Sequence, residues 1–172
     1  MTTRHSTLLE KARSLGFNQP ADFEGLAVAR GCWHYRQPDM PASHVVSEAR
    51  FSNEELAISL LSPSQPYSPH TIRLGAAMLG AIGNSSEKLL ALAKAEGSEI
   101  AVRYIAKAGL RFEPNNSLWH KLFQKLSDTP EPPSGVFPHP TRFISMTGFT
   151  RKGPGKVIVW IRPRADLTFT HG

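Results

Sequence analysis

The residues best suited to do chemistry in this 172-residue chain are its single cysteine and the histidines that could act as its base. Cys32 and His34 are two positions apart, so they would lie on one face of an extended strand. A cysteine becomes a nucleophile when a neighbouring base removes its proton. One hypothesis is therefore a small enzyme whose site lies around Cys32, His34 and the loop histidines, with His34, His44 or His70 as the base.

Other catalytic and metal-binding patterns are missing from the sequence. It contains no Gly-x-Ser-x-Gly and no His-Glu-x-x-His motif, and no second pair completes a zinc site around Cys32 and His34. The loop at Gly148–Gly153 is followed by proline rather than lysine, so it is no phosphate-cradling loop. We therefore predict no metal and no cofactor, and we favour a non-enzymatic protein over the enzyme.

Positive charge is concentrated near the C-terminus. The chain has a formal net charge of +6, and residues 141–172 hold six Lys and Arg against the single acid Asp166. Such a segment is either a solvated basic surface or a contact for phosphate groups or acidic side chains. The predicted partner is thus nucleic acid or an acidic protein surface. The predicted contact residues are Arg151, Lys152, Lys156, Arg162 and Arg164.

Start and stop signals predict a mainly helical middle of the chain. Ser52 precedes Glu55 by three residues, which is the pattern of a capping box, and Ser68 is followed by Pro69 at a first helical position. Apolar residues recur at helical spacing after each start. The predicted helices cover about 8–15, 52–61, 69–82, 86–96, 99–108 and 117–126.

Extended segments are predicted near both ends. Residues 142–150 and 156–163 are interpreted as two strands of a hairpin joined by residues 151–155. The run Val157–Ile161 is uniformly apolar, which is typical of a strand covered on both faces. The segment Leu26–Tyr35 is rich in residues that favour strands and is predicted to add an N-terminal strand.

Together these elements predict an α+β fold, with about six helices and a small antiparallel sheet made by the C-terminal hairpin and the N-terminal strand. We expect one domain over 1–172, with a helical body at 52–127, a proline-rich connection at 129–140 and a basic hairpin at 141–165. No apolar run is long enough to span a membrane, and the N-terminus lacks a signal-peptide core, so a cytoplasmic location is expected. The sequence does not indicate an oligomeric state. The expected function is that of a soluble binding or interaction module.

Overall fold

The computed structural model describes residues 7–17, 19–32, 51–64, 68–145, 149–150, 153–154 and 158–163. Within these ranges the chain is mainly helical with a small antiparallel hairpin, which confirms the predicted α+β class. The α-helices are α1 (Thr7–Ser14), α2 (Pro20–Ala29), α3 (Asn53–Leu60), α4 (Pro69–Leu79), α5 (Ser86–Glu96), α6 (Glu99–Phe112) and α7 (Ser117–Lys125). A 3₁₀ turn, η2 (Pro140–Phe143), precedes the strands β1 (Ile144–Ser145), β2 (Phe149–Thr150), β3 (Gly153–Pro154) and β4 (Val159–Trp160).

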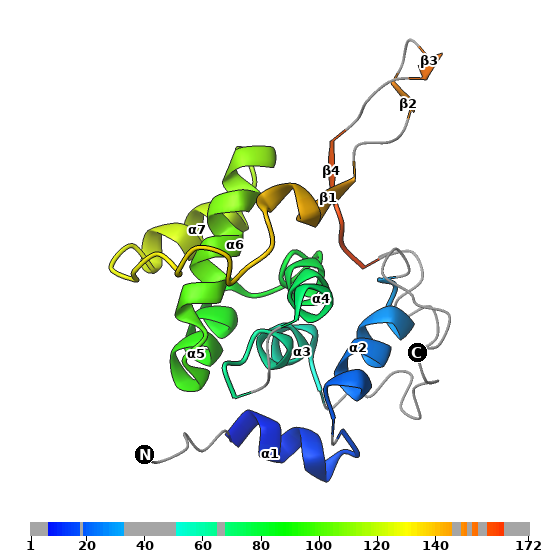
Figure 1. Ribbon diagram of the computed structural model, residues 1–172, viewed down its shortest axis with the longest axis vertical. Coiled ribbons are helices and arrows are strands. Elements are labelled where there is room, and N and C mark those ends of the chain that lie inside the picture. Colours follow the sequence, from blue (N-terminus) through cyan, green and yellow to red (C-terminus); the bar gives the residue numbers. More distant parts are fainter. Residues whose placement is uncertain are drawn as a thin grey trace.

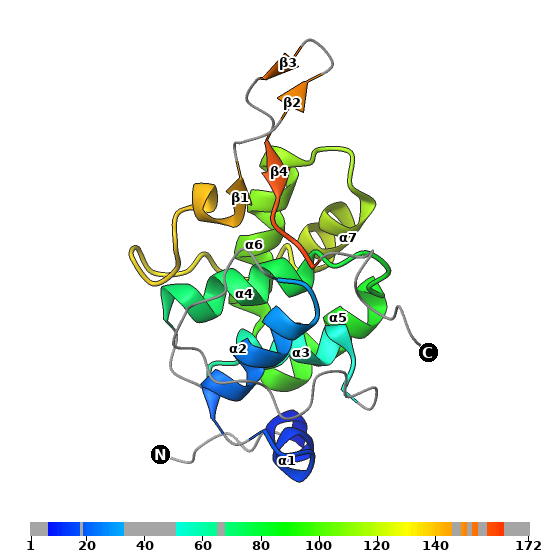
Figure 2. The ribbon, with the colours of Figure 1, turned by 90° about the vertical axis from the view of Figure 1, so that its right-hand side faces the viewer.

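The helices are grouped around α3 and α4, which lie at the centre of the molecule (Figures 1 and 2). Helix α1 lies at one end, and the hairpin leaves the helices at the opposite end (Figures 1 and 2). The faces of α3 and α4 that meet are apolar, and Leu56, Leu61 and Leu74 are fully buried between them and their neighbours. Burial of this continuous apolar core is the main source of stability.

The start of α3 has the capping box that the sequence predicts. Ser52 Oγ accepts a hydrogen bond from the backbone N–H of Glu55 at 3.1 Å, and Glu55 Oε1 accepts one from the N–H of Ser52 at 3.0 Å. Lys11 of α1 donates a further hydrogen bond to Glu55 Oε2 at 2.7 Å. The cap therefore fixes the beginning of the central helix and also ties α1 to it.

We expect Ser52→Ala to lower the free energy of unfolding by about 1 kcal/mol, because the backbone donor of Glu55 loses its acceptor. The measurement is chemical denaturation of the parent and the variant. Ser127→Ala is the matched control, since Ser127 is exposed and lies outside the helices, so its removal should leave the midpoint unchanged. Equal midpoints for all three proteins would contradict the role given to the cap.

The predicted N-terminal strand is wrong over Leu26–Ala29, because these residues belong to α2. Pro20 occupies the first turn of this helix, and the carboxylate of Asp22 accepts a hydrogen bond from the N–H of Gln19 at 3.0 Å. Helix α2 packs against both α3 and α4, so Leu26, Ala27 and Val28 are all buried. Burial on several sides removes the periodicity that would have distinguished a helix from a covered strand. Residues 33–35 of the predicted strand lie outside the described residues.

The C-terminal hairpin is present and is divided into two short antiparallel pairs. At its base Ile144 pairs with Trp160 and Ser145 with Val159, while further out Phe149 pairs with Pro154 and Thr150 with Gly153. The first strand begins only at Ile144, because Arg142 lies in η2. The expectation of a strand covered on both faces is also wrong, since Val159 is 46% exposed whereas Trp160 is 1% exposed.

Glycines inside the helices make room for large side chains. A Cβ at Gly75 of α4 would lie 2.6 Å from Cδ2 of Leu61, so the two helices could not approach as they do. Helix α6 continues to Phe112, beyond the predicted end at 108, and a Cβ at Gly109 would overlap the indole of Trp119. The close neighbours of these glycines are therefore side chains.

Candidate functional site

The predicted nucleophile Cys32 lies in the core. Its side chain is 1% exposed, and Sγ is 3.6 Å from Sδ of Met78. Burial raises the pKa of the thiol to about 12, so the thiolate is not populated at neutral pH. His34 and His44 lie outside the described residues, and the ring of His139 bonds to Thr141. His70, the described candidate base, lies in the first turn of α4. A buried and protonated thiol is no nucleophile at neutral pH.

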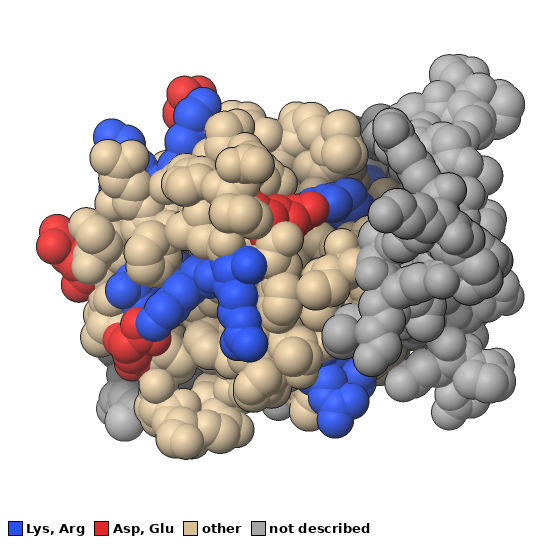
Figure 3. All heavy atoms as spheres, turned by 90° about the horizontal axis from the view of Figure 1, so that it is seen from above, with Lys and Arg blue, Asp and Glu red and all other residues tan. Residues whose placement is uncertain are grey.

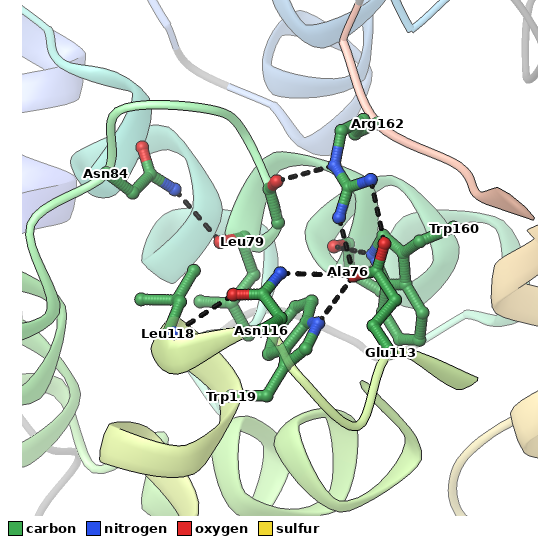
Figure 4. Close-up of polar contacts among 10 residues, drawn as sticks. Ala76, Leu79, Asn84, Glu113, Asn116, Leu118, Trp119, Trp160 and Arg162 are labelled. Carbon is green, nitrogen blue, oxygen red and sulfur yellow. Dashed lines mark hydrogen bonds and ion pairs between the residues drawn. The ribbon is translucent and has the colours of Figure 1, made fainter. Parts of the chain in front are cut away.

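Most of the predicted contact cations lie outside the described residues. This applies to Arg151, Lys152, Lys156 and Arg164, whereas Arg162 is described. Arg162 follows β4 and turns back towards the helices, where it bonds to α4 and to the segment after α6 (Figure 4). Its guanidinium therefore attaches the hairpin to the helices.

An ion pair joins the base of the hairpin to the helical body. Arg162 Nη2 donates to Glu113 Oε1 at 2.7 Å and Nη1 donates to Oε2 at 3.0 Å, which is a bidentate geometry (Figure 4). The Nε–H of Arg162 donates to the carbonyl of Gly80 at 2.9 Å. The two side chains are 20% and 25% exposed, so water screens the pair only in part.

Two tryptophans form the apolar half of the same junction. Trp160 of β4 and Trp119 of α7 lie with ring centroids 4.8 Å apart, and both are fully buried. The indole N–H of Trp160 donates to the carbonyl of Ala76 at 3.3 Å, and that of Trp119 donates to Glu113 Oε1 at 2.8 Å (Figure 4). We call Glu113, Trp119, Trp160 and Arg162 the hairpin anchor.

The anchor also sets the protonation state of Glu113. Burial alone would raise its pKa, but hydrogen bonds from Arg162, Trp119 and Asn116 and the positive charge of Arg162 outweigh it and hold the pKa below the ordinary 4.5. The carboxylate is therefore charged at neutral pH, as its bidentate pairing requires.

Sequence reasoning missed Glu113 and Trp119 as partners of the hairpin. The useful signals were the glycines Gly80 and Gly109, which mark places where a large side chain approaches a helix. A Cβ at Gly80 would lie 2.8 Å from Nε1 of Trp160. A glycine predicts close approach, but it does not identify the side chain that approaches.

A hollow of about 340 Å³ lies where the ends of α2 and α4 meet the start of α3. Its polar groups are already used inside the protein: Glu54 accepts a hydrogen bond from the N–H of Ser85 at 2.9 Å, and Arg30 donates to Asn53 at 2.9 Å. The hollow therefore offers no evident reactive group. In the described ranges no cluster of His, Cys, Asp and Glu is arranged to hold a metal ion.

Comparisons with protein families, curated protein sequences and solved structures find no match for this chain. Within the described ranges, every helix is too short or too polar to cross a lipid bilayer.

Proposed function

We propose that this chain is a non-enzymatic binding module that contacts nucleic acid through its basic hairpin, residues 141–165. The observation that carries the proposal is the hairpin's position: its outer pair, β2 and β3, projects well beyond the helices (Figures 1 and 2). Arg151 and Lys152 are the two residues that connect the paired Thr150 and Gly153. Two adjacent cations thus follow β2 directly in the sequence.

The anchor supports this proposal because it fixes the base from which the hairpin projects. Trp160 is buried among aromatic rings, and Arg162 is paired with Glu113, so the base cannot swing freely. A contact surface on a fixed support loses less conformational entropy when it binds. Arg162 is used in this attachment. The residues proposed to contact phosphate are therefore Arg151, Lys152, Lys156 and Arg164.

The charge excess favours a polyanion over a neutral partner. Phosphate contacts made by Lys and Arg release counterions and depend steeply on salt, but they carry no base specificity. We therefore expect binding with little sequence preference. No observation favours the alternative of an enzyme centred on Cys32, because its thiol is buried and protonated.

Three hairpin cations can be neutralised together in the variant Arg151→Gln, Lys152→Gln and Lys156→Gln. This variant should bind nucleic acid more weakly than the parent, by a similar factor for all sequences. The slope of log affinity against log salt should fall by about 2 to 3. The measurement is fluorescence anisotropy with labelled single- and double-stranded oligonucleotides at low and moderate salt.

The matched control removes the same charge from the helical body through Lys88→Gln, Lys121→Gln and Lys125→Gln, all at exposed positions. It should leave the salt slope near that of the parent. Absence of binding by the parent at low salt would contradict the nucleic-acid proposal. If the parent instead binds an acidic protein, the partner belongs to that second predicted class and not to nucleic acid.

A further inference from the structure

One face of α6 carries a row of cations one helical turn apart. Arg103, Lys107 and Arg111 follow one another at intervals of four residues, so their side chains lie along one line of the helix. The Arg103 guanidinium lies 4.9 Å from the centre of the Phe123 ring, and its side chain is 15% exposed, so it belongs to the packing between α6 and α7. Lys107 and Arg111 are exposed.

A carboxylate from the proline-rich segment, residues 129–140, lies against this row. Glu131 Oε1 accepts hydrogen bonds from Arg103 Nη1 at 2.7 Å and from Lys107 Nζ at 3.1 Å. These bonds lower the pKa of Glu131, so its carboxylate is charged at neutral pH. The side chain of Glu131 is 53% exposed, and another anion could therefore replace it at Lys107. In the part of the chain that the structure describes, no carboxylate pairs with Arg111.

A hollow of about 310 Å³ adjoins the row, because Glu131 also forms part of its wall. The rings of Tyr104 and Phe137 lie in the wall with centroids 5.3 Å apart, and the hydroxyl of Tyr104 donates to the carbonyl of Pro138 at 2.6 Å. This size is at the lower end of small-ligand pockets, which suits a single planar group. The remaining wall includes Pro132, Pro133 and His139.

The row runs along α6 towards the end of the molecule that carries the hairpin. The carboxyl end of α6 reaches the end from which the hairpin leaves (Figure 1). Seen from that end, Lys and Arg side chains are spread over the face together with a few acidic ones (Figure 3). One extended polyanion could thus contact both surfaces.

We infer that the α6 row and its hollow are a second contact surface for single-stranded nucleic acid, with phosphates at Lys107 and Arg111 and one base in the hollow. A duplex keeps its bases stacked, whereas a single strand offers bases that stack on aromatic side chains beside a cationic track. Glu131 competes with the phosphate at Lys107. This inference rests on the proposed function for its class of partner, which is nucleic acid. It adds that the nucleic acid is single-stranded and that α6 provides a second contact site.

The test compares anisotropy titrations of an oligothymidylate of about fifteen residues, the matching abasic strand and a duplex of equal length. Lys107→Gln with Arg111→Gln should weaken oligothymidylate binding at least about fivefold and reduce the salt slope by about 1.4. The control Lys121→Gln with Lys125→Gln removes the same charge from α7 and should change binding less than about twofold. Glu131→Gln should tighten binding, whereas the equally charged change Asp128→Asn at an exposed position should not.

The possible results distinguish the α6 contact surface from the hairpin proposal. An α6 variant that binds like its α7 control, or a parent that binds the abasic strand as tightly as oligothymidylate, would overturn the inference and leave the hairpin proposal in place. Loss of binding in the α6 variant together with unchanged binding in the hairpin variant would support the inference and overturn the hairpin proposal. A parent that binds none of the three probes would overturn both.

Discussion

Trp160→Ala should lower the free energy of unfolding by about 3–5 kcal/mol, enough to unfold a domain at the lower end of the usual stability range. Trp160 is 1% exposed and touches two other aromatic rings, with centroids 4.8 Å away at Trp119 and 5.6 Å away at Phe143. Its truncation would leave a cavity between α4, α7 and the hairpin, and the carbonyl of Ala76 would lose a donor. The measurement is thermal and denaturant unfolding.

The neighbouring residue supplies the control for that experiment. Val159 is in the same strand but is 46% exposed, so Val159→Ala should cost less than about 1 kcal/mol. If the alanine variant of Trp160 cannot be purified, Trp160→Phe keeps one aromatic ring but loses the N–H donor and part of the indole's volume, and it should show an intermediate loss. An alanine variant that melts like the parent would mean that the hairpin base adds nothing to the core.

Glu113→Gln should cost about 2 kcal/mol, because the carboxylate accepts hydrogen bonds from Arg162, Trp119 and Asn116 at the same time. An amide cannot accept them all, and its own N–H₂ group would face the donors of Arg162. The measurement is denaturant unfolding of the parent and the variant at several pH values. Asp128→Asn removes the same charge at an exposed position and should have little effect.

The pH dependence of this difference has a definite sign. The pKa of Glu113 is lower in the folded protein than its ordinary 4.5, so the ionised carboxylate stabilises the folded state above that value. The difference between parent and Glu113→Gln should therefore be full above about pH 5 and shrink as the pH falls through the lowered pKa. A difference that stays constant down to strong acid would contradict the ion pair with Arg162.

The local signals in the sequence predicted much of the fold. The caps at Ser52 and Ser68 place the starts of α3 and α4, because an N-cap oxygen and its backbone partner are only three residues apart. Helix α2 could not be recognised in this way, since its apolar residues are buried on several sides and show no helical period. Pro20 followed by Asp22 is a helix-start signal, but the composition of the segment that begins at Leu26 favoured a strand.

The attachment of the hairpin could not be predicted, because it depends on contacts between distant residues. Arg162 and Glu113 are 49 positions apart, and Trp160 and Ala76 are 84 apart. Nothing in the local sequence of Arg162 separates a cation that pairs internally from one that faces a partner. The prediction from charge alone therefore included Arg162 among the contact residues. The structure shows that Arg162 pairs with Glu113 instead.

The most direct test of the central claim is to find where nucleic acid touches the chain. Oligothymidylate bound at low salt would be cross-linked to the protein by ultraviolet light, and the modified peptides would be identified by mass spectrometry. We expect cross-links within residues 141–165, and they should weaken when Arg151, Lys152 and Lys156 are neutralised. Cross-links confined to the opposite end of the molecule, around α1, would contradict it (Figure 1).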